Sequence, residues 1–217
     1  MKIELIPPVV KANFKKLATP VVNIFVKYHL NPNWLTTVSL FIFIFSAVEF
    51  GRGHLRTAAV ALLLGGIFDM IDGAVARASN RVTRFGALYD STLDRYAEIF
   101  TFFGIGYYFI HKTGQGFESG LFVSMVVFIA LAGSIMVSYV RARAEGLEFE
   151  CKVGFMQRPE RIVMLSIGAL FGDRYLVGAL ILIAFFSHLT AIQRIFHIWT
   201  MEKSKKWTKM PIDIPHE

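Results

Sequence analysis

The sequence lacks several features that define common kinds of protein. It has a single cysteine, Cys151, so no disulfide can form within the chain. The six histidines are scattered with no spacing typical of metal ligands. Charged residues make up only 18% of the chain, and no internal repeat or low-complexity segment is present. The opening stretch MKIELIPPVVKANFKK carries prolines and lysines where a signal peptide needs an apolar core, so we expect no cleaved signal peptide.

Apolar residues are abundant instead. They make up 54% of the 217 residues, with 21 Phe, and the mean hydropathy is +0.51. This composition is too apolar for a soluble fold and is typical of a polytopic membrane protein. The net charge of +7 does not indicate nucleic-acid binding, because the positive charges recur between apolar runs and do not gather on one face or tail. We therefore expect membrane lipids and no nucleic acid as partners, and one membrane domain over residues 1–217.

The apolar runs predict an all-α fold. Six segments are each near the roughly 20 residues needed to cross a bilayer; they are 34–51, 55–77, 86–111, 117–142, 161–173 and 175–199. Residues 9–30 mix apolar side chains with four lysines, which suits an amphipathic helix in the membrane interface and equally a short solvated helix packed on the protein. The predicted fold class is an all-α polytopic membrane protein: an N-terminal interfacial amphipathic helix within 1–33, six transmembrane helices in 34–199, and a cytoplasmic tail, 200–217.

The distribution of lysine and arginine predicts the orientation. One set of connections, together with both terminal segments, holds 18 of these residues, and the opposite set holds only four. Because cytoplasmic loops carry the excess of positive charge, both termini are predicted to be cytoplasmic, with an even number of crossings.

Four aspartates stand out within the apolar stretch DMIDGAVARASNRVTRFGALYDSTLD, residues 69–94. Residues three and four apart share a helix face, which predicts one stripe on the second segment and another on the third. The stripes are Asp69, Asp72, Gly73 and Ala76, and Gly86, Asp90 and Asp94. The short basic turn 78–85 lets the two stripes face each other. Asp69 lies roughly 12 Å from Arg77 along the helix axis at 1.5 Å per residue, which places the carboxylates near the depth of lipid phosphates on the cytoplasmic side.

Four facing carboxylates need compensation, because like charges oppose ionisation. They could pair with neighbouring arginines or be protonated; the candidates for pairing are Arg77, Arg81, Arg84 and Arg95. The glycines and alanine on the same stripes favour another explanation, since they leave room for a ligand to approach the backbone. Mg²⁺ or Mn²⁺ prefers oxygen ligands and bridges carboxylates to substrate phosphates, often as two ions. The residues therefore predict metal-dependent phosphate chemistry at the membrane surface.

The stretch also fits the pattern D-x2-D-G-x2-A-R-x8-G-x3-D-x3-D without a mismatch. It resembles the signature of the CDP-alcohol phosphotransferase family, whose six-helix topology agrees with the segments above. The resemblance implies an enzyme in which an alcohol attacks the phosphorus nearer the lipid of a CDP-linked donor and CMP leaves. It also implies a prokaryotic cytoplasmic membrane and a homodimer.

The resemblance implies roles for individual residues. Asp69, Asp72 and Asp90 would hold one Mg²⁺ or Mn²⁺ ion, and Asp69, Asp90 and Asp94 would hold or border a second. Asp94 would also be the catalytic base. The residues that would contact CDP-diacylglycerol are Asn33, Thr36, Gly73, Ala76, Arg77, Thr83 and Gly86. For Asn33 and Thr36, which lie in the helix start NPNWLTT, ordinary helix capping is an equal alternative.

A second basic group on the predicted cytoplasmic side indicates an acceptor that bears a phosphate. Its members are Ser138, Arg141, Arg158, Arg161 and Arg194, although positive-inside bias and headgroup contacts explain some of them. The SYVRARAE and RPER stretches resemble the phosphatidylinositol-phosphate synthase branch, which implies inositol 1-phosphate as acceptor; Arg141 stands where that branch usually has a lysine. Glycerol 3-phosphate is the alternative acceptor. A membrane transporter is a remote alternative, because the outer halves of the segments are nearly all apolar. Glu98, one helical turn past Asp94, is expected to pair with Arg95 or with a neighbouring helix.

Overall fold

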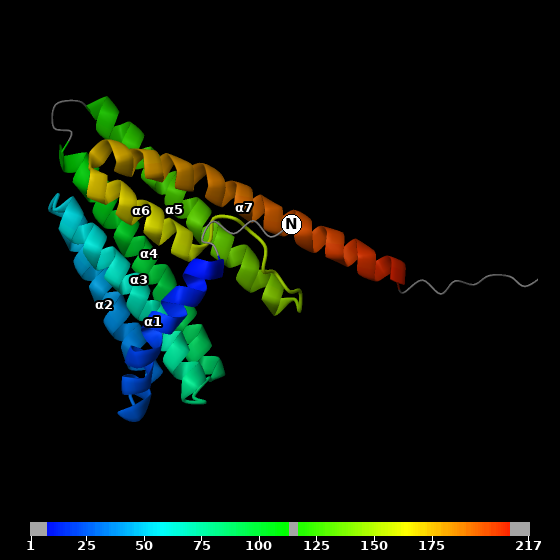
Figure 1. Ribbon diagram of the computed structural model, residues 1–217. Coiled ribbons are helices and arrows are strands. Elements are labelled where there is room, and N and C mark those ends of the chain that lie inside the picture. Colours follow the sequence, from blue (N-terminus) through cyan, green and yellow to red (C-terminus); the bar gives the residue numbers. More distant parts are fainter. Residues whose placement is uncertain (1–7, 113–116, 209–217) are drawn as a thin grey trace, which may run out of the picture.

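The computed structural model describes residues 8–112 and 117–208, and within them every regular element is a helix (Figure 1). The seven helices are α1 (Pro8–Lys27), α2 (Pro32–Gly51), α3 (Leu55–Ala78), α4 (Arg84–Lys112), α5 (Phe117–Gly146), α6 (Arg158–Phe171) and α7 (Asp173–Thr208). The six apolar segments predicted from the sequence correspond to α2 through α7. The all-helical prediction is confirmed.

The helix bounds differ from the predicted ones at charged ends. The sixth segment was expected to end at residue 199, but α7 continues to Thr208 through much of the predicted tail. The fifth was expected to begin at residue 161, but α6 already begins at Arg158, with Pro159 in its first turn. Proline is tolerated there because the first N–H groups of a helix have no partner within it. Apolarity marks the part of a helix that lies in lipid, whereas hydrogen bonding continues beyond it.

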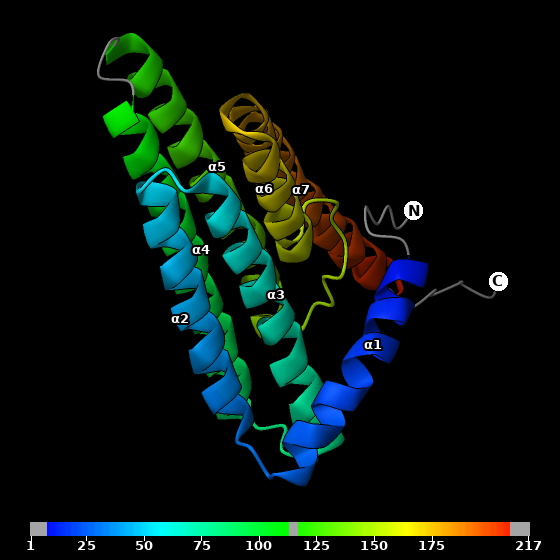
Figure 2. The same cartoon turned by 60° about the vertical axis from the view of Figure 1, so that its left-hand side comes forward.

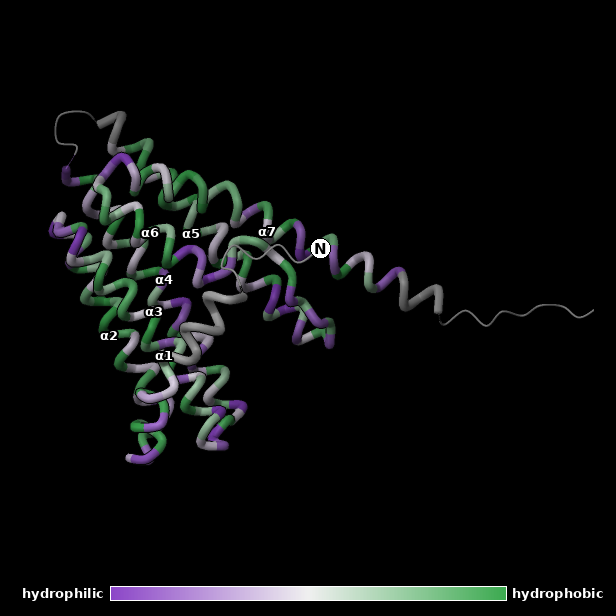
Figure 3. Tube along the Cα trace, viewed as in Figure 1, coloured by the Kyte–Doolittle hydropathy of each residue, from purple (hydrophilic) through white to green (hydrophobic). Residues whose placement is uncertain are grey.

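Among the described residues, four helices are long and apolar enough to cross a membrane; these spans are Pro32–Gly51, Leu55–Ala78, Gly120–Gly146 and Asp173–Lys203. Figure 3 shows the apolar residues along the helices and the hydrophilic ones mostly near their ends. The remaining two segments miss this standard for different reasons. Helix α6 has only 14 residues. Helix α4 has 29, but Asp90, Asp94, Arg95 and Glu98 interrupt its apolar run.

The core joins α2 through α7. Helix α2 packs along both α3 and α4, α5 packs along α4 and α7, and α6 lies against α3 and α7 (Figures 1 and 2). The largest buried side chains come from several of these helices and include Phe50, Phe102, Leu62 and Leu180. Close approach of α2 and α4 depends on Gly104, because a Cβ atom there would lie only 2.2 Å from the carbonyl oxygen of Ala47. Small residues permit such contacts between membrane helices.

Helix α1 attaches to one end of the bundle. Val22 of α1 packs with Leu35, Ile71 and Val75 in a separate small apolar cluster, and α1 diverges from the bundle toward its own N-terminus (Figure 2). The same end contains the start of α2, the end of α3 and the start of α4. This end of the molecule is where the aspartate stripes meet.

Candidate active site

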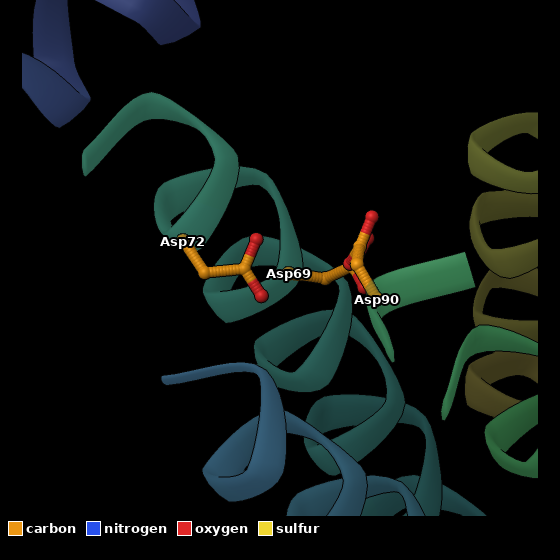
Figure 4. Close-up of side chains that lie close together, drawn as sticks. All are labelled: Asp69, Asp72 and Asp90. Carbon is orange, nitrogen blue, oxygen red and sulfur yellow. The ribbon is translucent and has the colours of Figure 1, made fainter. Parts of the chain in front are cut away.

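Three aspartates from two helices meet at this end. Asp69 and Asp72 lie on α3, Asp90 lies on α4, and one carboxylate oxygen from each falls within 4.8 Å of the others (Figure 4). The short connection after Ala78 reverses the chain, so the facing stripes predicted from helical spacing come together in the fold. Each residue brings oxygen ligands of the kind that Mg²⁺ and Mn²⁺ prefer.

The environment of Asp72 fits a bound cation. Its side chain is only 3% exposed, and its Oδ2 atom has no hydrogen-bond partner among the described residues. A buried carboxylate oxygen is costly to leave unpaired, and nearly all buried polar groups in proteins have partners. Three converging carboxylates with an unpartnered buried oxygen are therefore suited to hold a divalent metal ion.

Asp94 joins the group through Arg158, an arginine 64 residues further along the chain. The Nη1 atom of Arg158 lies 2.6 Å from Oδ1 of Asp94 and 2.6 Å from Oδ2 of Asp69. The guanidinium also lies over the ring of Phe43, 5.3 Å from its centroid. Arg158 was predicted from the sequence as an acceptor-phosphate residue. The structure places it directly beside the carboxylate expected to act as base.

A pocket of about 250 Å³ opens beside the aspartates. Its lining includes all seven residues that the resemblance implied for the CDP-linked donor, together with Asp72 and Asp90; the seven are Asn33, Thr36, Gly73, Ala76, Arg77, Thr83 and Gly86. They come from α2, α3, α4 and the connection between α3 and α4. The fold thus gathers residues from separate parts of the sequence around one cavity that ends at two of the carboxylates.

The two glycines keep this pocket open. A Cβ atom at Gly86 would lie 2.9 Å from Oγ1 of Thr83 and 3.3 Å from Oδ1 of Asn33, so it would fill the space between α2 and the start of α4. The backbone N–H of Gly86 donates a hydrogen bond to the same Thr83 hydroxyl, at 2.9 Å. A Cβ atom at Gly73 would lie 3.3 Å from Nη1 of Arg77, which places that guanidinium over the glycine at the pocket. A flat ligand could therefore lie against the backbone with a cation beside it.

At the start of α2, one residue caps the helix and different residues line the pocket. The side chain of Asn31, not Asn33, caps the helix by accepting a hydrogen bond from the backbone N–H of Asn33, at 3.0 Å. Thr36 donates to the carbonyl of Pro32, at 3.1 Å. Sequence reasoning missed Thr37, whose hydroxyl lies 3.0 Å from the hydroxyl of Tyr89 and links α2 to α4 near the pocket. Only the three-dimensional register of the helices reveals that pair.

The remaining predicted acceptor residues do not converge on one open site. Arg141 is exposed on α5, where its Nε donates to Glu145 at 2.8 Å, and Ser138, one turn earlier, donates to the carbonyl of Ser134 at 3.3 Å. Arg194 is 2% exposed and donates to the backbone carbonyls of Val153 and Val137. It therefore holds the connection between α5 and α6 against α7.

Arg161 also has protein partners. It is 1% exposed, and its Nε donates to Oε1 of Glu98 at 2.7 Å while its Nη1 donates to the carbonyl of Met156 at 3.0 Å. Its guanidinium therefore lies inside the bundle, bound to α4 and to the chain just before α6. The expected partnership of Glu98 with a neighbouring helix is what the structure contains.

Comparison with known proteins agrees with this geometry. The family model described as CDP-alcohol phosphatidyltransferase matches residues 29–201. An archaetidylinositol phosphate synthase from Methanothermobacter thermautotrophicus is 38% identical over 176 residues, which cover 78% of this chain and 84% of the relative. The crystal structure of Mycobacterium tuberculosis phosphatidylinositol phosphate synthase with CDP-DAG bound superposes with a TM-score of 0.76 at 28% identity, covering 85% of this chain and 94% of that one.

A second crystal structure of the Mycobacterium tuberculosis enzyme, in complex with manganese and citrate, superposes with a TM-score of 0.75 at 29% identity, covering 84% of this chain and 89% of that one. The long apolar helices and these likenesses together indicate an integral membrane protein. The chain belongs to the CDP-alcohol phosphatidyltransferase family, and it is an enzyme that transfers a phosphatidyl group and releases CMP.

Proposed function

We propose that this enzyme transfers the phosphatidyl group of CDP-diacylglycerol to inositol 1-phosphate, giving phosphatidylinositol phosphate and CMP. The observation that carries the proposal is the pocket of about 250 Å³, whose lining combines the seven predicted donor residues with two of the clustered carboxylates. The names of the relatives, which include phosphatidylinositol phosphate synthase and archaetidylinositol phosphate synthase, favour an inositol phosphate as acceptor.

In this proposal the aspartates hold two divalent ions, Mg²⁺ or Mn²⁺. Asp69, Asp72 and Asp90 bind one, supported by their mutual distances, and Asp69, Asp90 and Asp94 bind or border the second. The ions supply charge neutralisation at the diphosphate and at the departing CMP. Arg77, beside Gly73 in the pocket, adds a cation that can form two parallel hydrogen bonds to the diphosphate.

Asp94 acts as the base. It takes the proton of the acceptor hydroxyl while the hydroxyl oxygen forms a bond to the phosphorus nearer the lipid, and the bond from that phosphorus to the CMP oxygen breaks. Arg158 binds the acceptor phosphate from a position next to this base, supported by the 2.6 Å distance between Nη1 and the carboxylate of Asp94. Arg141 and Ser138, which have partners on α5 itself in this structure, are proposed to contact the acceptor phosphate only when it is bound. The N–H groups of Arg161 and Arg194 donate hydrogen bonds to protein oxygens, so these two residues support the site from within the bundle.

The proposal includes a membrane arrangement. The chain forms one membrane domain in which α2 to α7 make six crossings and α1 lies in the interface. Both termini and the pocket face the cytoplasm, as the distribution of positive charge indicates. The donor's acyl chains remain in lipid while the soluble acceptor reaches the carboxylates from the water side. The enzyme works in a prokaryotic cytoplasmic membrane as a homodimer.

Release of CMP by the purified protein in lipid tests the proposal. CDP-diacylglycerol is offered with inositol 1-phosphate, glycerol 3-phosphate, inositol or serine in separate reactions, each with and without EDTA. We expect turnover with inositol 1-phosphate and its loss with EDTA. Turnover with glycerol 3-phosphate alone would replace the proposed acceptor, and turnover that persists in EDTA would exclude the metal-dependent reaction.

Substitution of the base provides the second test. Asp94→Asn should lower turnover by at least about 100-fold, the lower bound for losing a positioned general base, while CDP-diacylglycerol still binds. Asp173→Asn, which changes a carboxylate at the opposite end of α7 from the site, is the matched control and should retain turnover. Retained activity in Asp94→Asn would remove Asp94 as the base.

A further inference from the structure

A buried ion pair connects α4 with α6 one layer deeper than the proposed site. Glu98 of α4 is 8% exposed and Arg161 of α6 is 1% exposed. The Oε1 atom of Glu98 lies 2.7 Å from Nε and 2.6 Å from Nη2 of Arg161. A small cavity beside this pair is lined mostly by apolar side chains, among them Phe43, Leu62 and Phe102, and also by Arg158 and Thr101.

This is the second of two ion pairs that join α4 to α6. Glu98 follows Asp94 by four residues on α4, so these two carboxylates share one face of that helix. Arg161 follows Arg158 by three residues on α6, so the two arginines likewise share a face. The first ion pair is the 2.6 Å contact between Arg158 and Asp94. In the described part of the chain the backbones of α4 and α6 do not pack along each other, whereas α6 does pack along α3 and α7. The long charged side chains therefore span the space that separates α4 from α6.

The energetics of such a pair indicate what it contributes. Removing two charges from water costs about as much as their attraction returns, so a buried ion pair is often no more stable than apolar side chains of similar size. Apolar residues would serve this part of the bundle equally well for stability. What they would not provide is a fixed axial position, because apolar surfaces slide against each other more easily than a hydrogen-bonded guanidinium and carboxylate.

We propose that Glu98 is a positioning residue that fixes the register of α6 relative to α4 through Arg161. Because Arg161 lies one turn after Arg158 on a rigid helix, this register holds Arg158 between Asp69 and Asp94. Arg161 also donates to the carbonyl of Met156, which fixes the chain just before α6. The inference rests on the proposed function for the roles of Asp94 and Arg158, but the register itself can be measured without any reaction.

The test replaces the charged pair with apolar side chains of similar size, Glu98→Leu together with Arg161→Met. Spin labels at Tyr96→Cys and Ile167→Cys, two positions that are half exposed on α4 and α6, report the distance between the helices by electron spin resonance in a Cys151→Ala background. We expect the folded double variant to melt close to the unaltered protein, with a label distance distribution that shifts or broadens.

The kinetic readout separates positioning from general damage. The KM for the phosphorylated acceptor should rise about tenfold or more, the factor expected when one charge-assisted hydrogen bond is lost, while the KM for CDP-diacylglycerol changes less than about twofold. Glu98→Gln keeps the shape of the side chain and one hydrogen bond to Arg161. It serves as a second variant and should shift both readouts in the same direction by a smaller amount.

The control is Glu49→Gln. Glu49 is also a buried glutamate with charged partners, Arg52 at 3.0 Å and His54 at 2.8 Å, but it lies at the opposite end of α2 from the site. This variant should leave the label distances and both KM values unchanged. An unchanged distance distribution in both Glu98 variants would overturn the proposal. If the unaltered enzyme used no phosphorylated acceptor, the proposed function would fail, and the label distances would still decide the role of Glu98.

Discussion

Replacing Gly104 by alanine tests how the contact between α2 and α4 holds the site together. The added Cβ atom would lie 2.2 Å from the carbonyl oxygen of Ala47 and 2.8 Å from its carbonyl carbon. Ordinary van der Waals contact begins near 3.4 Å, so the two backbones must move apart by about 1.2 Å. The clash involves a helix backbone, which cannot rotate away as a side chain can.

The magnitude follows from two opposing effects. Overpacking a well-packed core costs up to about 3 kcal/mol, and a glycine-to-alanine change within a helix returns about 1 kcal/mol of helix propensity. The variant should therefore be less stable by about 2 kcal/mol, which lowers the melting temperature by roughly 4–8 °C for a chain of this size. Because Asp90 of α4 and Thr36 of α2 line the same pocket, the separation should widen this proposed donor pocket and raise the KM for CDP-diacylglycerol.

Thermal unfolding in detergent, followed by intrinsic fluorescence, measures the first effect, and CMP release measures the second. Gly178→Ala in α7 is the matched control, since a Cβ atom there meets nothing within 4 Å. It should melt at the same temperature as the unaltered protein or slightly higher. If Gly104→Ala behaved like Gly178→Ala in both assays, the close approach of α2 and α4 would be refuted.

Three further predictions concern the metal, the far end of the bundle and the cysteine. Saturation with Mn²⁺ at 100 times the dissociation constant should stabilise the protein by about 2.7 kcal/mol; in Asp72→Asn the resulting rise in melting temperature should largely disappear, and a full rise would argue against Asp72 as a ligand. Asp173→Asn should lower the free energy of unfolding by at most about 1 kcal/mol, because Asp173 accepts a 2.7 Å hydrogen bond from Tyr108 and pairs with Lys112. The variant should keep the stabilisation by Mn²⁺, because Asp173 lies far from the metal site. Cys151 should react slowly with iodoacetamide at pH 8 and rapidly in denaturant, because the side chain is fully buried and burial raises the pKa of its thiol. Rapid labelling of the folded protein would contradict the packing of the connection between α5 and α6.

The sequence alone determined the features that depend on local spacing. The apolar runs predicted α2 through α7 within a few residues at most ends, because each helix must cover its backbone with apolar side chains of suitable length. The placement of Asp69 and Asp72 on one face, and of Asp90 on the next helix, followed from the helical repeat. The short connection between α3 and α4 leaves little freedom in how these faces meet. That is why the carboxylate cluster could be predicted from spacing, whereas the residues that line the adjacent pocket were predicted from the resemblance to the family signature.

The partners of the arginines could be decided only by the tertiary structure. Nothing in the order of residues distinguishes Arg158, which lies between Asp69 and Asp94, from Arg161 and Arg194, whose guanidinium groups are turned into the bundle. Arg158 and Arg161 stand three residues apart in one RPER stretch, and Arg194 stands within the last apolar segment. Which carboxylate or carbonyl an arginine meets depends on the rotation and axial position of helices that are distant along the chain. Helical periodicity fixes which residues share a face, whereas packing between helices fixes what that face meets.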